Sequence, residues 1–181
     1  GRPLWTSYPY DPLKQITRVR DAAGNVTRIA YDNLGRRVMI DNPDTGRITK
    51  RFDAAGNLVR KVTAKLRAEG GAITYDYAFN RRTAIHYPDP AYDVAYAYGG
   101  PNASANRAGR IKRVEDEAGH ETRSYGPLGN VVEEARTVDA ADSGGKAATY
   151  ATEYVYDSFG RLQSLVYPDD EAVRYGYDSG G

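Results

Sequence analysis

The chain repeats an aromatic residue, an aspartate and a glycine at a fixed spacing, and this repeat constrains the fold more than any other feature. Tyr31-Asp32-x-x-Gly35 returns as Phe52-Asp53-x-x-Gly56, 21 positions later. An aromatic residue followed by a turn occurs at Tyr10, Tyr31, Phe52, Tyr77, Tyr98, Tyr125, Tyr156 and Tyr177, with separations of 21, 21, 25, 21, 27, 31 and 21. Near Tyr77, Tyr75-Asp76 is the alternative position. Periods of roughly 20–50 residues are typical of repeat architectures.

Each unit contains an Asp-x-x-Gly turn. Aspartate at the first position of a type I turn accepts hydrogen bonds from the backbone N–H groups ahead of it. Glycine at the fourth position takes the left-handed conformation that closes a hairpin. A second turn lies about half a repeat later. The expected turn residues are Asp32, Gly35, Asp53, Gly56, Asp157 and Gly160 in the first set, and Asp21, Gly24, Asp116 and Gly119 in the second.

Two four-residue turns leave room for two strands of about six residues in each 21-residue unit, an ordinary strand length. Composition favours the same structure, because 16 Tyr and 19 Gly stand against 3 Phe and a mean hydropathy of -0.67, which suits half-buried aromatic residues on β-hairpins. One hairpin cannot bury enough apolar surface to offset its ordering entropy. We therefore predict an all-β fold of stacked antiparallel β-hairpin repeats forming a curved ribbon, with the repeat aromatics packed between copies.

The domain organisation follows from the longer intervals. We predict a single array over residues 1–181, with loop insertions near residues 64–76, 99–108 and 136–150. The first and third leave room for a helical turn, which Gly70-Gly71 and Gly144-Gly145 interrupt. Because the chain starts without Met and stops within a motif, we expect it to be a piece of a longer chain. Terminal hairpins without caps predict self-association through sheet edges.

Residues suited to catalysis or metal binding are few. His86 is interpreted as a strand residue and His120 as a turn residue, and two histidines 34 positions apart in a chain without Cys lack zinc-site spacing. The carboxylate pair Asp139 and Asp142 and the run Asp169-Asp170-Glu171 are interpreted as solvated acids. Nucleotide-binding and hydrolase motifs are absent from the sequence. We predict no catalytic residue, no metal site and no cofactor, and hence no enzyme.

Charge and hydropathy limit the partners. The 25 Lys and Arg residues nearly cancel the 24 Asp and Glu residues, which argues against nucleic acid as a partner. No apolar run approaches the roughly 20 residues of a membrane span. Tyrosine is a rigid contact residue, so a Tyr-rich sheet face that binds glycan or a cell-surface protein remains the alternative to a purely structural function.

The repeat resembles the YD repeats of the Rhs family. The resemblance is carried by Tyr31-Asp32-x-x-Gly35-Arg36 and by the heptad Tyr156-Asp157-Ser158-Phe159-Gly160-Arg161-Leu162, followed by Tyr167-Pro168-Asp169. This family includes bacterial Rhs and wall-associated polymorphic toxins, the C subunits of Tc insecticidal toxin complexes, and the teneurins. The D-P-x-G-type motif and the catalytic aspartates of toxin members have no counterpart in this sequence, so no residue is assigned to autoproteolysis.

The resemblance implies a β-ribbon that spirals into a hollow shell, enclosing a toxic C-terminal domain in bacterial members. The expected function is thus a non-catalytic segment of a bacterial, secreted or cell-surface toxin. Its expected partners are further YD repeats and an encapsulated toxin domain. About sixteen strands at about 4.8 Å would close into a ring of roughly 24 Å, too narrow for a folded cargo of about 100 residues. The segment is therefore expected to form an arc or a single coil of the wall.

Overall fold

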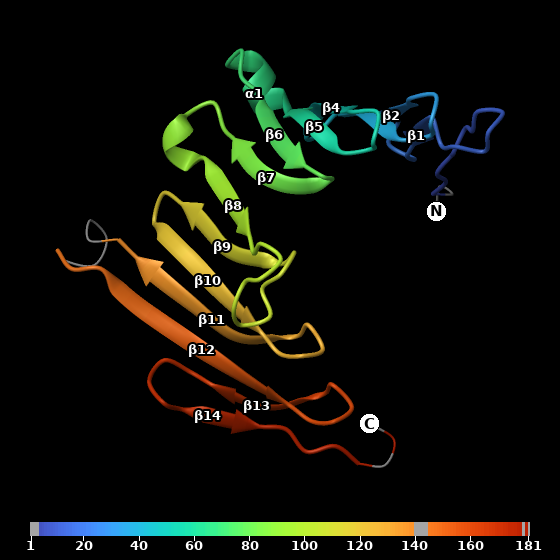
Figure 1. Ribbon diagram of the computed structural model, residues 1–181. Helices are drawn as coiled ribbons and strands as arrows, with labels where there is room; N and C mark the ends of the chain where they lie inside the picture. The colour runs from blue at the N-terminus through green and yellow to red at the C-terminus, as the bar shows by residue number, and fades with distance from the viewer. Residues whose placement is uncertain (1–3, 140–144, 179, 181) are drawn as a thin grey trace. The chain divides into compact units, whose positions relative to one another are not determined.

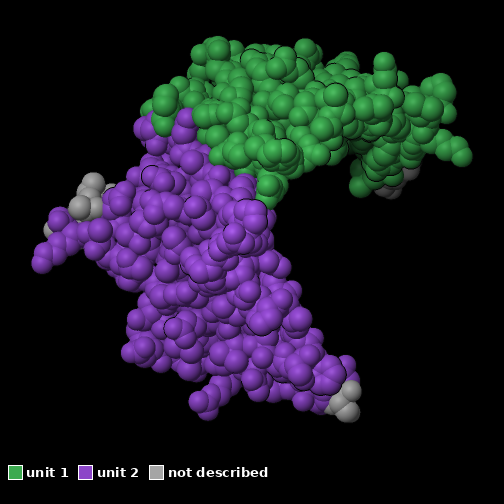
Figure 2. Space-filling view, viewed as in Figure 1, with its two compact units in different colours: residues 1–90 green, residues 91–181 purple. Residues whose placement is uncertain are grey.

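The structure, a computed structural model, describes residues 4–139, 145–178 and 180. Two compact units divide the chain, Gly1–Pro90 and Ala91–Gly181 (Figure 2). Within the described residues the fold consists of β-strands, one short helix α1 (Ala64–Ala68) and a single 3-10 turn at Pro90–Tyr92. In each unit the strands pair antiparallel with their neighbours in sequence, as Figure 1 shows.

The first unit contains seven of the described strands. They are β1 (Arg18–Arg20), β2 (Val26–Tyr31), β3 (Arg37–Asn42), β4 (Gly46–Phe52), β5 (Leu58–Val62), β6 (Ile73–Ala78) and β7 (Arg81–His86). Helix α1 follows β5 directly. The Thr63 side chain caps it by accepting a hydrogen bond from the Leu66 N–H at 3.3 Å, and Gly70 ends the segment at φ +71°.

The second unit also contains seven described strands. They are β8 (Val94–Tyr98), β9 (Ile111–Asp116), β10 (Gly119–Tyr125), β11 (Val131–Val138), β12 (Ala148–Tyr156), β13 (Leu162–Val166) and β14 (Ala172–Arg174). The longest pairings are those of β10 with β11 and of β11 with β12.

The apolar core is thin. Among the described residues, Val62 and Tyr125 are the only buried hydrophobic side chains. Apolar residues instead form rows across strands on one face, as where Ile29 pairs with Ile40 and Ile40 pairs with Ile48. A single-layer sheet has no second layer to bury such a row. The backbone ladder and cross-strand pairs therefore contribute more of the stability than a closed core does.

The predicted all-β fold of antiparallel hairpin repeats is confirmed by this strand order. In the three regions where insertions were expected, the structure differs in detail. The first holds α1, and β6 already begins at Ile73. The second is the loop between β8 and β9. In the third, β11 continues to Val138 and β12 begins at Ala148, while residues 140–144 lie outside the described part. The description as a single array remains a prediction.

Candidate functional site

The turn after β2 illustrates how the repeat motif is built. Asp32 Oδ1 accepts hydrogen bonds from the backbone N–H groups of Leu34 at 3.0 Å and Arg36 at 2.9 Å. Gly35 donates its N–H to the Asp32 carbonyl at 2.9 Å and has φ +76°, the left-handed region where a side chain would be strained. The aspartate fixes the turn and the glycine closes it.

The other predicted turn residues occupy comparable positions, except that Asp116 and Gly119 are strand ends that pair directly across a two-residue turn. Asp157 Oδ1 accepts from the Phe159 and Arg161 N–H groups, and Gly160 has φ +76°. The remaining acids accept backbone N–H groups in the same way: Asp21 from Asn25, Asp53 from Asn57, and Asp116 from Ala118. Gly24, Gly56 and Gly119 have φ values of +91°, +91° and +135°.

These hydrogen bonds stabilise the charged carboxylates. The Arg161 backbone N–H lowers the pKa of Asp157, and the Arg161 guanidinium adds to this effect. The Asn25 side chain lowers the pKa of Asp21 in the same way, and the Asn57 side chain that of Asp53. For Asp32, partial desolvation acts in the opposite direction, and the hydrogen bonds from Arg36 outweigh it so that the pKa is lowered.

A register shift occurs at the repeat aromatic in six hairpins. Ala30 pairs with Met39 but Tyr31 pairs with Arg37, so β3 carries one extra residue at that point. The same shift falls at Phe52, Tyr77, Tyr98, Tyr125 and Tyr156. A β-bulge re-aims the side chain beside it and increases the local twist. The repeat aromatic therefore marks the place where each hairpin bends before its turn.

Four repeat tyrosines donate their hydroxyl to a backbone carbonyl of the preceding repeat. Tyr31 reaches Ile16 at 3.1 Å, Tyr77 reaches Leu58 at 3.0 Å, Tyr125 reaches Ile111 at 2.7 Å and Tyr177 reaches Leu162 at 2.7 Å. In every case the accepting residue is the ladder partner of the preceding repeat aromatic: Tyr10, Phe52, Tyr98 and Tyr156 respectively. We name these four contacts the tyrosine links. Each one ties a hairpin to the hairpin before it.

An arginine after the turn glycine also connects neighbouring repeats. Arg36 Nε donates to Asp32 Oδ2 at 2.7 Å, while its guanidinium lies 4.9 Å from the ring centroid of Phe52 in the next repeat. Arg161 likewise donates to Asp157 at 2.8 Å and lies 4.4 Å from the Tyr177 ring. Sequence reasoning did not assign this role. The signal was the Arg that follows Gly35 and Gly160, combined with the cation–π preference of Arg.

A network of charged side chains links three strands of the second unit. Arg136 on β11 donates to both carboxylate oxygens of Asp116 on β9, at 2.6 and 2.8 Å. Arg123 on β10 pairs with Glu121 at 2.6 Å and with Glu134 at 3.1 Å. The Arg136 guanidinium lowers the pKa of Asp116. These pairs cross strands on one face and do not form a catalytic arrangement.

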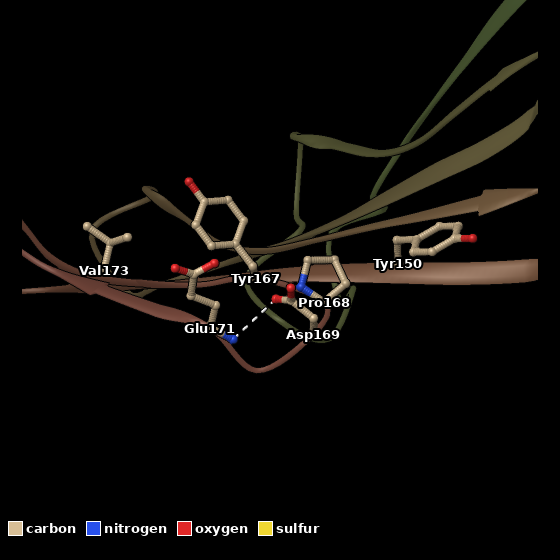
Figure 3. Close-up of a pocket in the computed structure, with 6 residues that line it drawn as sticks. All are labelled: Tyr150, Tyr167, Pro168, Asp169, Glu171 and Val173. Carbon is tan, nitrogen blue, oxygen red and sulfur yellow. Dashed lines mark hydrogen bonds between the residues drawn. The ribbon is translucent and has the colours of Figure 1, made fainter.

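A concave surface lies beside the turn between β13 and β14. It has a volume of about 630 Å³ and is lined by Tyr150, Tyr167, Pro168, Asp169, Glu171 and Val173. Figure 3 shows Tyr167 and Pro168 between Val173 and Tyr150, with the Glu171 N–H donating to Asp169 Oδ1 at 3.2 Å. Aromatic rings beside carboxylates on an open surface are suited to polar ligands that carry an apolar face.

The histidines do not form a site with one another. His86 on β7 lies with its Nε2 3.1 Å from Asp76 Oδ2 on β6. His120 was interpreted as a turn residue, but it lies in β10 opposite Thr137, because Gly119 pairs directly with Asp116 and the turn ends there. Of the predicted acid pair, Asp142 lies outside the described residues. In the part of the chain that the structure covers, no group of three or more His, Asp or Glu side chains is arranged to hold a metal ion.

The chain is a series of consecutive β-hairpins, and tyrosine links join four of them to the hairpin before. This arrangement is that of a β-hairpin repeat protein. The resemblance to the YD-repeat, or Rhs, family is confirmed by a match of residues 10–47 to the RHS Repeat family model. That match covers the first two repeat aromatics, Tyr10 and Tyr31, with the turn between Asp32 and Gly35.

Solved structures with the same fold come from Tc toxins. The crystal structure of TcdB2-TccC3-TEV matches with a TM-score of 0.77 and 19% identity, over 97% of this chain and 10% of that chain. TcdB2-TccC3 matches at 0.65 and 20%, over 96% and 11%. The Photorhabdus luminescens Tc holotoxin pore matches at 0.65 and 17%, over 93% and 9%. A search of curated protein sequences found no match.

The chain spans about a tenth of the length of these solved chains. At such identities the likeness establishes the fold. Within the described residues, no helix has the length and apolar character needed to cross a membrane.

Proposed function

We propose that this chain is a non-catalytic wall segment of a YD-repeat shell, in a bacterial secreted toxin that encloses a C-terminal toxic domain. The observation that carries the proposal is the tyrosine link. At four repeats it connects a hairpin to the preceding one through a backbone carbonyl, so it has the same form wherever it recurs. Its chemistry joins repeats, which is the role expected of a wall.

The mechanism of such a wall is physical containment. A sheet whose strands follow sequence order extends by adding hairpins, and its backbone hydrogen bonds are satisfied by the neighbouring strands. Its partners in this proposal are the further repeats of the parent chain and the enclosed toxin domain. Likeness to the Tc toxin structures supports this assignment, and the RHS repeat supports it from the sequence.

Limited proteolysis of the complete parent chain tests containment. We expect the domain encoded after the repeats to resist protease in the native chain and to be cut rapidly when residues 91–181 are deleted, because the deletion opens the wall. The same domain expressed alone is the control for its intrinsic resistance. Equal cleavage rates in the native and deleted chains would contradict the proposal.

A second candidate function is glycan or protein binding by a Tyr-rich surface, and the concave surface at Tyr150 and Tyr167 favours it. Tyrosine rings can stack on a sugar ring while Asp169 and Glu171 accept hydrogen bonds from hydroxyl groups. A glycan array with the wild-type chain and the Tyr150→Ala and Tyr167→Ala variants tests this candidate. Binding lost in both variants supports it, and an array without any bound glycan argues against it.

A further inference from the structure

The nearly neutral chain consists of two oppositely charged halves. Residues 1–90 contain 16 Lys and Arg residues against 9 Asp and Glu residues, whereas residues 91–181 contain 9 against 15. These halves coincide with the two compact units. The overall balance of charge, which argued against nucleic acid as a partner, therefore does not describe the surface of the first unit.

The strand register gathers the positive charge of the first unit on one face. Arg18 pairs directly with Arg28, and Arg51 pairs directly with Arg60. Ladder partners share a face, as do residues two or four apart on one strand. Asp41 pairs with both Arg28 and Arg47, so these three residues share a face. Arg51 lies four positions after Arg47 on the same strand, so the two arginine pairs belong to that face as well. We name it the arginine face, formed by the exposed side chains of Arg18, Arg20, Arg28, Arg47, Arg51 and Arg60.

The chain itself neutralises little of this charge. Arg47 pairs with Asp41 at 2.7 Å. For Arg18, Arg28, Arg51 and Arg60, no carboxylate of the described residues lies within ion-pair distance. Like charges placed directly opposite each other destabilise a sheet. Two opposed arginine pairs on one face are therefore an arrangement that an anionic partner would stabilise.

The chemistry of the face distinguishes between anionic partners. Guanidinium groups bind carboxylates and phosphates alike in a bidentate geometry, so the side chains around the arginines decide between the two. Single-stranded nucleic acid binds on aromatic rings that stack with its bases, but the uncharged residues between the two arginine pairs on this face are Ala30, Met39 and Thr49. Trp5 lies at the margin, 6.0 Å from Arg20. Between the two arginine pairs, therefore, bases have no aromatic ring to stack on.

We propose that the arginine face of the first unit binds an acidic polypeptide segment in an extended conformation. In such a segment, carboxylates on alternate residues lie about 7 Å apart. The two opposed arginine pairs, on β1/β2 and on β4/β5, lie three strand spacings or about 14 Å apart. Carboxylates four residues apart in the segment can therefore each meet one pair. This inference goes beyond the wall function, because a wall segment requires no such partner, and its failure would leave the proteolysis experiment unaffected.

Binding of a fluorescein-labelled 20-residue polyglutamate, measured by fluorescence anisotropy on the whole chain, tests the proposal. We expect saturable binding that weakens as NaCl concentration rises, since the contacts are solvent-exposed ion pairs. Combining Arg18→Gln, Arg28→Gln, Arg51→Gln and Arg60→Gln should weaken binding at least about tenfold. Thermal unfolding should show that this variant keeps its fold, because it removes only like-charge contacts.

A matched control comes from the same two strands. Lys50 and Lys61 pair directly with each other on the opposite face of β4 and β5. The variant Lys50→Gln with Lys61→Gln therefore changes net charge as much as Arg51→Gln with Arg60→Gln does. We expect only the arginine variant to weaken binding. Equal weakening by both variants, absence of polyglutamate binding, or tighter binding of a single-stranded oligodeoxynucleotide of equal charge would each overturn the proposal.

Discussion

Tyrosine at the repeat position contributes two separable contacts. Its ring lies at the register shift, where the hairpin bends, and its hydroxyl reaches the preceding repeat. Phe52 separates the two contacts, because it retains the ring at the register shift and has no hydroxyl to donate. There the Arg36 guanidinium stacks on the ring instead. Ring and hydroxyl are therefore independent contributions, and each can be tested by itself.

Tyr125→Phe should lower the free energy of unfolding by about 1–2 kcal/mol. The substitution removes the 2.7 Å hydrogen bond to the Ile111 carbonyl, and Tyr125 is only 9% exposed, so water replaces that bond poorly. Urea denaturation measures the change. Tyr150→Phe is the control, because the same chemical change is made on a side chain that is 51% exposed. Equal effects of the two substitutions would contradict the role of the tyrosine links.

Gly160→Ala should destabilise the chain by about 1 kcal/mol through backbone strain alone. Gly160 has φ +76°, and a Cβ added there would meet no atom within 4 Å, so steric overlap does not contribute. Gly176→Ala is the matched control, because its surroundings are equally open and its φ lies outside the left-handed region. Thermal unfolding should show a lowered Tm for the first variant and an unchanged Tm for the second.

Between strands, the contact of Asp116 with Arg136 joins β9 to β11 across the intervening β10. Hydrogen bonds from Arg136 lower the pKa of Asp116 from its ordinary value of 3.8. A carboxylate whose folded pKa is depressed contributes stability that is fully present above pH 3.8. This contribution is lost as the pH falls through the lower folded value.

We therefore expect the free energy of unfolding to fall as the pH drops below 3.8, and to fall less steeply in the Asp116→Asn variant. Urea denaturation between pH 2 and pH 6 measures both slopes. Asp44→Asn, at an exposed turn, is the control for removal of an acid in general. If Asp116→Asn left the slope unchanged, the ion pair would have no part in the acid sensitivity.

Local chemistry made the turns and hairpins predictable from sequence, because Asp32 and Gly35 act within four residues of each other. The tyrosine links were not predictable in this detail. Their acceptors, such as Leu58 for Tyr77, are set by ladder register and by the bulge. The strand position of His120 depends on the tight pairing of Gly119 with Asp116. The arginine face was missed because Arg51 and Arg60 become neighbours only through register.

Over the whole chain, strand order that equals sequence order keeps contacts local. Each hairpin depends on its neighbours, and a strand at the end of such a series has one unpaired edge. Within the described residues, β14 pairs with β13 alone. The Tyr175 N–H donates to the Gln163 carbonyl, so in the alternating antiparallel pattern the N–H groups of Ala172 and Arg174 face away from β13. Such an edge is a template for pairing with another chain.

We expect the chain to self-associate through this edge. In sedimentation experiments the average mass should rise with concentration, and Ala172→Pro should reduce the rise. Proline removes an outward-facing N–H and leaves the net charge and the ladder with β13 intact. Ala172→Val, which keeps that N–H, is the control. About 0.5 M NaCl screens the attraction between the oppositely charged halves. Association that persists at this salt concentration is therefore due to edge pairing. A monomer at every concentration would contradict the prediction.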